Sequence, residues 1–155
     1  MSVVVAVAIV ANGILTGAFF VFSCAVGPAL GRLDDAGFIR AYRAINRVIL
    51  GPWFLTVFTL APVSAVAAAV IGVRYPHIVL LIAAAACAVI VFAVTVAVNV
   101  PLNRALDDAV VDSDPQRRSA RQRFEAPWNR GNLVRTIAGA GALACLALAA
   151  TGAVP

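Results

Sequence analysis

Charge is the scarcest property of this chain. Only 12% of its 155 residues are charged, seven of them are acidic, and there is a single histidine. No Asp, Glu, His or Lys falls within any of its four long apolar stretches. Proton-driven transport uses intramembrane carboxylates, and haem, copper, zinc and di-iron sites need His, carboxylate or clustered thiolate ligands. We therefore predict no metal and no cofactor in the bundle, and the sequence disfavours a small transporter.

Cysteine is also rare, with three in the chain: Cys24, Cys87 and Cys145. Each lies within a predicted apolar span, and no C-x-x-C spacing occurs. We interpret them as small apolar packing residues. The alternative is a lipoprotein signal ending at "VFSC", with Cys24 acylated. An uncharged N-terminus and the arginines that follow the stretch favour an uncleaved helix instead.

What the chain has in excess is apolar sequence, which makes up 63% of its residues. Four stretches are long enough to cross a hydrocarbon core of about 30 Å, which takes roughly 20 helical residues. They cover about residues 3–28, 53–73, 78–100 and 133–154. A backbone in hydrocarbon must satisfy its own hydrogen bonds, so each stretch is expected to be a helix. The predicted fold class is all-α, a single-domain integral membrane four-helix bundle over residues 1–155.

Arginine is distributed unevenly among the connections between these spans. Four arginines lie in the first connection, at about residues 29–52, seven lie in or beside the third, at about 101–132, and one lies in the second. The positive-inside rule then places the first and third connections in the cytoplasm and both termini outside, in a cell (inner or plasma) membrane. The net charge of +5 reflects topology and attraction to anionic lipid. Nucleic acid is not a predicted partner, and the lipid bilayer is.

The first connection has the pattern of an amphipathic helix. Asp34 and Asp35 are suited to cap its start. Apolar side chains and arginines recur at spacings of three and four on separate faces: Phe38, Tyr42, Ile45 and Ile49, and Arg40, Arg43 and Arg47. We expect this helix to lie on the inner membrane surface and to end at Gly51 and Pro52, before an interfacial Trp53.

The third connection is the most hydrophilic part of the chain. From Asp107 to Gln122, acids and arginines alternate with Ser, Pro and Gln, which predicts a solvated cytoplasmic loop with a short helix. Pro127 suits a first helical position, so the last helix is expected to begin there. Asn129, Asn132 and either Arg135 or Thr136 would then lie on one side of that helix.

Polar residues also share one face of the first span. Asn12, Thr16 and Ser23 recur at offsets of four and seven, so we expect this face to point into the bundle. Gly13 and Gly17 form a G-x-x-x-G spacing that lets another backbone approach closely.

The predicted topology gathers polar side chains at the inner ends of all four spans: Ser23, Thr56, Thr59, Thr95, Asn99, Asn132, Arg135 and Thr136. Two interpretations are open. These groups cap the helix ends and tie them together, or they form a pocket open to the cytoplasm. In such a pocket, amides and a guanidinium would hold an anionic oxygen while apolar helix walls hold flat hydrocarbon.

Four segments match a known family in order and spacing: "GILTGAFFVFSCAVGPALGRLDD", "AINRVILGPWF", "VTVAVNVPLNRAL" and "WNRGNLVRT". From about Gly13 to Ala150 the chain resembles the anthrone oxygenase-like family of small four-helix membrane proteins. The resemblance implies oxidation of anthrones to anthraquinones with dioxygen, without an evident metal or flavin. The family pattern falls on Pro28, Asn46, Asn99, Pro101, Asn103, Trp128, Asn132 and Arg135. Some relatives carry a His near the start of the last helix, where this chain has "NRGN", so a mechanism using that His would not transfer.

The resulting hypothesis is a cofactor-independent oxygenase that acts on a lipophilic aromatic small molecule in the cytoplasmic half of the bundle. Its predicted catalytic residues, which would stabilise an oxyanion, are Arg135, Asn99 and Asn132. Its predicted substrate-binding residues are Asn46, Asn103, Trp128, Asn129, Thr95 and Thr56. No general base is evident. The alternative is a non-enzymatic scaffold that recognises a lipid or a partner through this Asn/Arg belt, and a homo-oligomer is open in either case.

Overall fold

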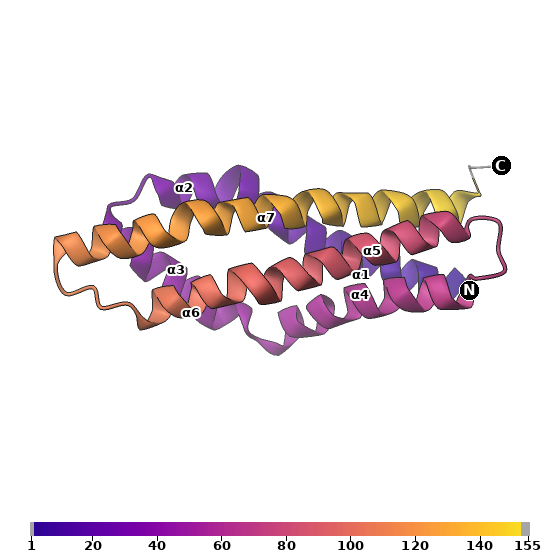
Figure 1. Cartoon of the computed structure of the whole chain (residues 1–155), viewed down its shortest axis with the longest axis horizontal. Coiled ribbons are helices and arrows are strands. Elements are labelled where there is room, and N and C mark those ends of the chain that lie inside the picture. The colour runs from indigo at the N-terminus through magenta and orange to yellow at the C-terminus, as the bar shows by residue number, and fades with distance from the viewer. Residues whose placement is uncertain (1, 153–155) are drawn as a thin grey trace.

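The computed structural model describes residues 2–152, and this part of the chain is helical without a strand. Four rods run side by side along the long axis (Figure 1). The rods are α1 (Ser2–Val21) with η1 (Phe22–Val26) and α2 (Gly27–Gly31); α4 (Pro52–Ile71); α5 (Ile78–Val94) with η2 (Thr95–Asn99) and α6 (Val100–Asp108); and α7 (Asp114–Thr151). Each rod is long and apolar enough to cross a membrane, so the all-α class is confirmed, with four helical rods able to span a membrane.

The two ends of the bundle differ in what they contain. The start of α1, the end of α7 and the turn between α4 and α5 lie together at one end, and α3 (Asp35–Ile49) lies towards the other (Figure 1). The 38 residues of α7 form a helix of about 57 Å, which is longer than the roughly 30 Å of a hydrocarbon core. Part of the bundle therefore extends beyond any membrane that it spans.

Two rods contain a single π-helical turn just before a proline. The N–H of Gly27 bonds to the carbonyl of Phe22, and the N–H of Val100 bonds to that of Thr95, in both cases five residues back. Pro28 and Pro101 follow directly. A proline lacks an N–H and crowds the carbonyl four residues earlier, so a widened turn lets each rod continue past it.

The third connection differs from its prediction. Residues 101–132 were expected to form a connection that is a solvated loop with a short helix, but α6 continues to Asp108 and α7 begins at Asp114 after a reciprocal cap between Ser113 and Gln116. The expectation that Pro127 begins a helix was wrong, because Pro127 lies inside α7. The segment folds because Ala120, Phe124 and Trp128 recur every four residues on one face of α7 and are buried, while the side chains of Arg118, Arg123 and Arg130 are exposed.

The first connection contains the expected helix, α3, with Asp34 as its N-cap accepting a 2.8 Å bond from the backbone N–H of Gly37. Its apolar face is covered by protein, however, because Phe38 and Tyr42 pack with the aromatic residues of α7. A location of α3 on a membrane surface stays a prediction. The helix ends at Ile49 and α4 begins at Pro52, as expected.

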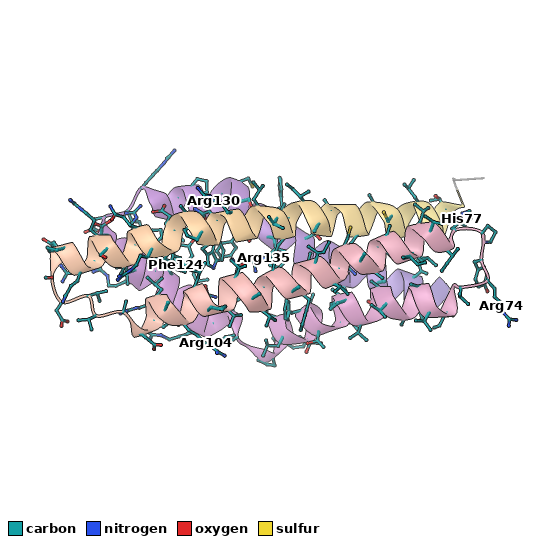
Figure 2. All side chains as sticks on the ribbon, viewed as in Figure 1. Arg74, His77, Arg104, Phe124, Arg130 and Arg135 are labelled. Atoms are coloured by element: carbon teal, nitrogen blue, oxygen red, sulfur yellow. The ribbon has the colours of Figure 1, made fainter. Side chains whose placement is uncertain are left out.

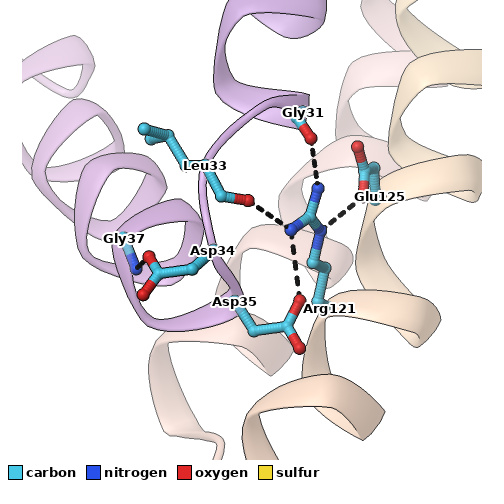
Figure 3. A network of polar contacts seen from close by, with 7 residues as sticks. All are labelled: Gly31, Leu33, Asp34, Asp35, Gly37, Arg121 and Glu125. Atoms are coloured by element: carbon cyan, nitrogen blue, oxygen red, sulfur yellow. Dashed lines mark hydrogen bonds and ion pairs between the residues drawn. The ribbon is translucent and has the colours of Figure 1, made fainter.

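Two arginines clamp α3 in place. Arg121 of α7 donates to the carbonyls of Gly31 and Leu33 and to the carboxylates of Asp35 and Glu125, at 2.7 to 3.1 Å (Figure 3). On the other side of α3, the Arg43 guanidinium donates to the last carbonyls of α6, those of Leu106 and Ala109, at 2.7 to 3.2 Å. Charged donors thus fix the loop before α3 and the helix itself to the neighbouring rods.

Candidate functional site

A small cavity lies where five elements meet. It has a volume of about 70 Å³, and its walls come from α1 with η1, from α3, from the start of α4, from η2 with α6, and from α7. Most of the wall is apolar, but seven of the nine sequence-predicted site residues line it: Asn46, Thr95, Asn99, Asn103, Trp128, Asn132 and Arg135. Of the eight residues expected to gather at the inner ends of the spans, Thr95, Asn99, Asn132 and Arg135 line this cavity together.

Arg135 is the only charged side chain among the described residues that line the cavity, and it is 4% exposed. It lies between the rods in Figure 2. Its guanidinium carbon lies 4.2 Å from the ring centre of Phe19 and 5.3 Å from that of Trp128, so aromatic rings flank the cation. Its Nη2 donates to Asn132 Oδ1 at 2.9 Å, and Nη1 reaches Thr95 Oγ1 at 3.4 Å.

Two features of Arg135 remain uncompensated within residues 2–152. Its Nε–H has no hydrogen-bond partner, and no carboxylate lies within ion-pair distance of the guanidinium. A buried charge without a counter-charge is costly, and so is a buried donor without an acceptor. Both deficits would be removed by an anionic oxygen placed beside Nε.

Asn132 holds this arginine rather than facing a ligand. Its Nδ2 donates to the Phe19 carbonyl at 2.9 Å and to Ser23 Oγ at 2.7 Å, while its Oδ1 accepts from Arg135. The Ser23 hydroxyl lies 3.2 Å from that of Thr136 in turn. Every polar atom of the Asn132 amide is thus engaged, and the residue joins α1 and η1 to α7.

Asn99 and Asn103 are held by α7 in a similar way. Asn99 Nδ2 donates to the Trp128 carbonyl at 3.2 Å, and Trp128 Nε1 donates to Asn103 Oδ1 at 2.8 Å. Asn99 Oδ1 has no partner and lies against Gly131, where a Cβ atom would come within 2.7 Å of it. The glycine is therefore needed for this close approach. Asn99 thus fixes the helix pair through one N–H of its amide.

The α3 wall contributes one predicted and one unpredicted residue. Asn46 is 5% exposed, and its Nδ2 has no partner within the described chain. Tyr42, one helical turn earlier, also lines the cavity and packs with Phe124 and Trp128. Burial, with a further contribution from Glu125, raises the pKa of the Tyr42 hydroxyl to about 12, and Arg135 opposes this rise. Its offset of four from Asn46 was the signal in the sequence that could have added Tyr42 to the site.

Two predicted site residues lie elsewhere. Thr56 is exposed on α4, and its hydroxyl donates to the carbonyl of Pro52 at 2.8 Å. Asn129 is exposed and lines a separate groove beside α2. The sequence predicted how far along its helix Thr56 lies, but not which face of the helix it occupies. Thr56 therefore lies on a face of α4 that does not line the cavity.

No group of three His, Cys, Asp or Glu side chains within residues 2–152 lies close enough to hold a metal ion together. The polar atoms that face the cavity are amides, hydroxyls, an indole and a guanidinium. Such groups bind oxygen atoms through hydrogen bonds, and a guanidinium favours an anionic one.

The fold and the site define a class of protein: a membrane-type four-helix bundle with an internal cavity that carries an uncompensated arginine. Within this class, the chain belongs to the anthrone oxygenase family, whose sequence profile matches residues 38–145. This range includes every sequence-predicted site residue and leaves out Phe19 and Ser23 of the first rod. No curated protein and no solved structure matches the chain.

Proposed function

We propose that the protein binds a lipophilic aromatic compound through an ionised oxygen and oxidises it with dioxygen, without a cofactor. The observation that supports this most directly is the Nε–H of Arg135, which is buried, cationic and unpaired beside the cavity. Membership of the anthrone oxygenase family supports a compound of the anthrone type.

The chemistry requires an electron-rich anion in an apolar site. When such a compound loses a proton from its CH₂ group, the charge is shared with the carbonyl oxygen, and Arg135 would stabilise that oxygen. The reactive carbon transfers an electron to dioxygen and forms a C–O bond, which gives a peroxide that takes up a proton. Loss of the second C–H proton with cleavage of the O–O bond leaves a carbonyl and releases water. The balance is one CH₂ group and one O₂ giving one C=O and one H₂O.

Aromatic neighbours would suit the body of such a ligand. The rings of Phe19 and Trp128 already flank Arg135 of α7. Asn46 of α3, which also lines the cavity, adds an unpaired amide donor. The volume of about 70 Å³ holds only water-sized molecules, so a three-ring compound requires the wall to open. We place this opening at Leu50 and Phe54, because Leu50 lies in the turn between α3 and α4 and Phe54 lies in the first turn of α4, beyond both arginine clamps.

The absence of a base on the wall supports a second candidate, a protein that binds the anion without oxidising it. No Asp, Glu or His is among the described residues that line the cavity. The oxygenase hypothesis therefore requires a substrate that is acidic enough to ionise in water. Oxygen consumption separates the two candidates, since binding alone consumes none.

The test is oxygen uptake by the purified protein with anthrone, compared between Arg135→Gln and Arg74→Gln. Arg74 lies at the far end of the bundle, between α4 and α5 (Figure 2). Removing one charge-stabilising donor costs about 10²-fold to 10³-fold in rate, so Arg135→Gln should lose that much and Arg74→Gln should match the wild type. Equal rates in all three proteins would refute the role of Arg135. Saturable anthrone binding without oxygen uptake would support the binding protein instead.

We also propose that the membrane is the cell membrane, with α3 and the connection between α6 and α7 in the cytoplasm. The support is the concentration of arginines near these elements, which the positive-inside rule assigns to the cytoplasmic side. Labelling of intact cells with a membrane-impermeant maleimide tests this orientation. A cysteine introduced at Arg74 should react, and one introduced at Arg118 should react only after lysis.

A further inference from the structure

Exposed arginines recur beside the cavity on three different helices. The dipeptide Asn-Arg occurs once each on α3, α6 and α7: Asn46-Arg47, Asn103-Arg104 and Asn129-Arg130. All three arginines are exposed. Successive residues on an α-helix point about 100° apart, so the inward Asn46 and Asn103 leave the arginine that follows each of them free to face outward, whereas Asn129 is itself exposed. We name Arg47, Arg104 and Arg130 the arginine belt.

The belt lies at one level of the bundle. Asn46 and Asn103, which precede two of its arginines, line the same cavity. Trp128, two residues before the third arginine, is hydrogen-bonded to Asn103 at 2.8 Å. In Figure 2, Arg104 and Arg130 lie at nearly the same position along the long axis, on opposite edges of the bundle.

The surface changes character at this level. Next to Arg47, the end of α3, the turn after it and the start of α4 expose large apolar side chains, with Val48 80%, Leu50 64% and Trp53 88% exposed. Around the first residues of α3 and of α7, the surface instead carries acids and arginines such as Asp114 and Arg118. Exposed Trp beside Arg is typical of the boundary between acyl chains and lipid headgroups.

We propose that the arginine belt binds the phosphate groups of an anionic membrane leaflet, so that the cavity lies at the boundary between headgroups and acyl chains. None of the three arginines has a carboxylate within ion-pair distance in the described chain, so their charge is available to a ligand. A guanidinium binds phosphate through two parallel hydrogen bonds. This inference does not depend on the proposed oxidation, because a binding protein or scaffold would need the same position in the membrane.

The first test is a titration of the detergent-solubilised protein with fluorescent phosphatidylglycerol and, separately, with fluorescent phosphatidylcholine. The wild type should prefer phosphatidylglycerol, and added salt should weaken this preference. The triple variant Arg47→Gln, Arg104→Gln, Arg130→Gln should lose about fivefold in phosphatidylglycerol affinity for each arginine removed. Its matched control removes the same charge from exposed arginines outside the belt, at positions 40, 118 and 123.

The control should keep the affinity of the wild type. The proposal is overturned if the wild type binds both lipids equally. It is also overturned if the belt variant binds phosphatidylglycerol as the wild type does, or if the control loses as much affinity as the belt variant, since net charge rather than the belt would then explain binding.

A second measurement tests directly how deep the arginine belt lies in the bilayer, and it needs no variant of the belt. The chain has two tryptophans, so Trp128→Phe leaves Trp53 as the single indole. In vesicles, Trp53 fluorescence should be quenched most by lipids brominated close to the headgroup. Stronger quenching by lipids brominated near the chain terminus, or quenching by aqueous iodide alone, would place the belt away from the phosphates and overturn the proposal.

Discussion

The two halves of the bundle have cores made of different side chains. The half that contains the start of α1 and the end of α7 is built largely from alanine and leucine, with Ala8, Ala68, Ala84, Leu81 and Leu146 in one buried cluster. The half that contains α3 and α6 is built around aromatic rings, namely Phe38, Tyr42, Phe124 and Trp128. Small residues bring helix backbones close together, whereas rings hold the helices further apart.

This difference follows from the solvent that each half would meet. Between helices in lipid there is no hydrophobic driving force, so close van der Waals contact must hold them together. In water, burying large rings is strongly favourable, and charged clamps such as those of Arg43 and Arg121 can be solvated at their edges. The cavity and Arg135 lie where the two kinds of core meet, with Phe19 from the alanine-rich side and Trp128 from the aromatic side.

The largest expected effect comes from truncating a ring in the aromatic half. Phe124 is 3% exposed and contacts Phe38, Tyr42 and Trp128, so Phe124→Ala should lower the free energy of unfolding by about 3 to 5 kcal/mol. Leu146→Ala, in the alanine-rich half, should cost less, because lipid tails replace part of the lost contact in the membrane-inserted reference state. Unfolding by denaturant in bicelles measures both.

If Leu146→Ala lowers the free energy of unfolding as much as Phe124→Ala does, the two halves are stabilised in the same way. The proposed difference between their cores would then be wrong. Phe20→Ala serves as the control, because Phe20 is 56% exposed and should change little.

The second effect concerns the pH dependence of stability in the aromatic half. Because burial raises the pKa of Tyr42 from 10.0 to about 12, the unfolded state loses this proton first as the pH rises. The contribution of Tyr42 is thus fully present below pH 10 and is lost as the pH rises towards 12. Its size is about 3 kcal/mol, from roughly 1.4 kcal/mol for each pKa unit. Tyr42→Phe should flatten this part of the stability profile, measured by thermal unfolding between pH 9 and pH 12.

The exposed Tyr75 provides the matched control, and Tyr75→Phe should leave the profile of the wild type unchanged. A profile that Tyr42→Phe does not alter would mean that the hydroxyl is as well solvated in the fold as in the unfolded chain.

The alanine-rich half was the easier one to predict from the sequence. Long apolar runs allow one structure in lipid, so the four spans followed directly from hydropathy. In the aromatic half, the helix α3 was predicted, but the start of α7 was expected to be a solvated loop with a short helix because its charges are dense, although Ala120, Phe124 and Trp128 recur at helical spacing among them. The charges there indicated solvation, whereas Arg121 faces α3 and holds the loop before it through hydrogen bonds.

The sequence predicted most of the residues that line the cavity, but not what each of them does there. Depth and spacing identified Arg135 and the asparagines that surround it, and these residues do line one cavity. Which amides are free depends on long-range geometry: Asn132 is occupied by Phe19 and Ser23, whose positions result from the packing of α1 on α7. Tyr42 was left out because aromatic residues on an amphipathic helix look the same whether they face lipid, protein or a cavity.

The smallest effect tests how tightly the alanine-rich half is packed. The sequence pointed to Gly13 and Gly17 as the positions of close approach, but a Cβ at Gly17 meets nothing within 4 Å and one at Gly13 meets only Leu143, at 3.9 Å. The close contact is at Gly139 of α7, where a Cβ would overlap the side chain of Thr16. Gly139→Ala should therefore cost about 1 to 3 kcal/mol of stability, as overpacking does. Gly17→Ala should be neutral or stabilise by up to about 1 kcal/mol, since Ala is the better helix former. Unfolding in bicelles compares the pair, and equal costs would mean that this half has room to adjust and that its small residues do not enforce close packing.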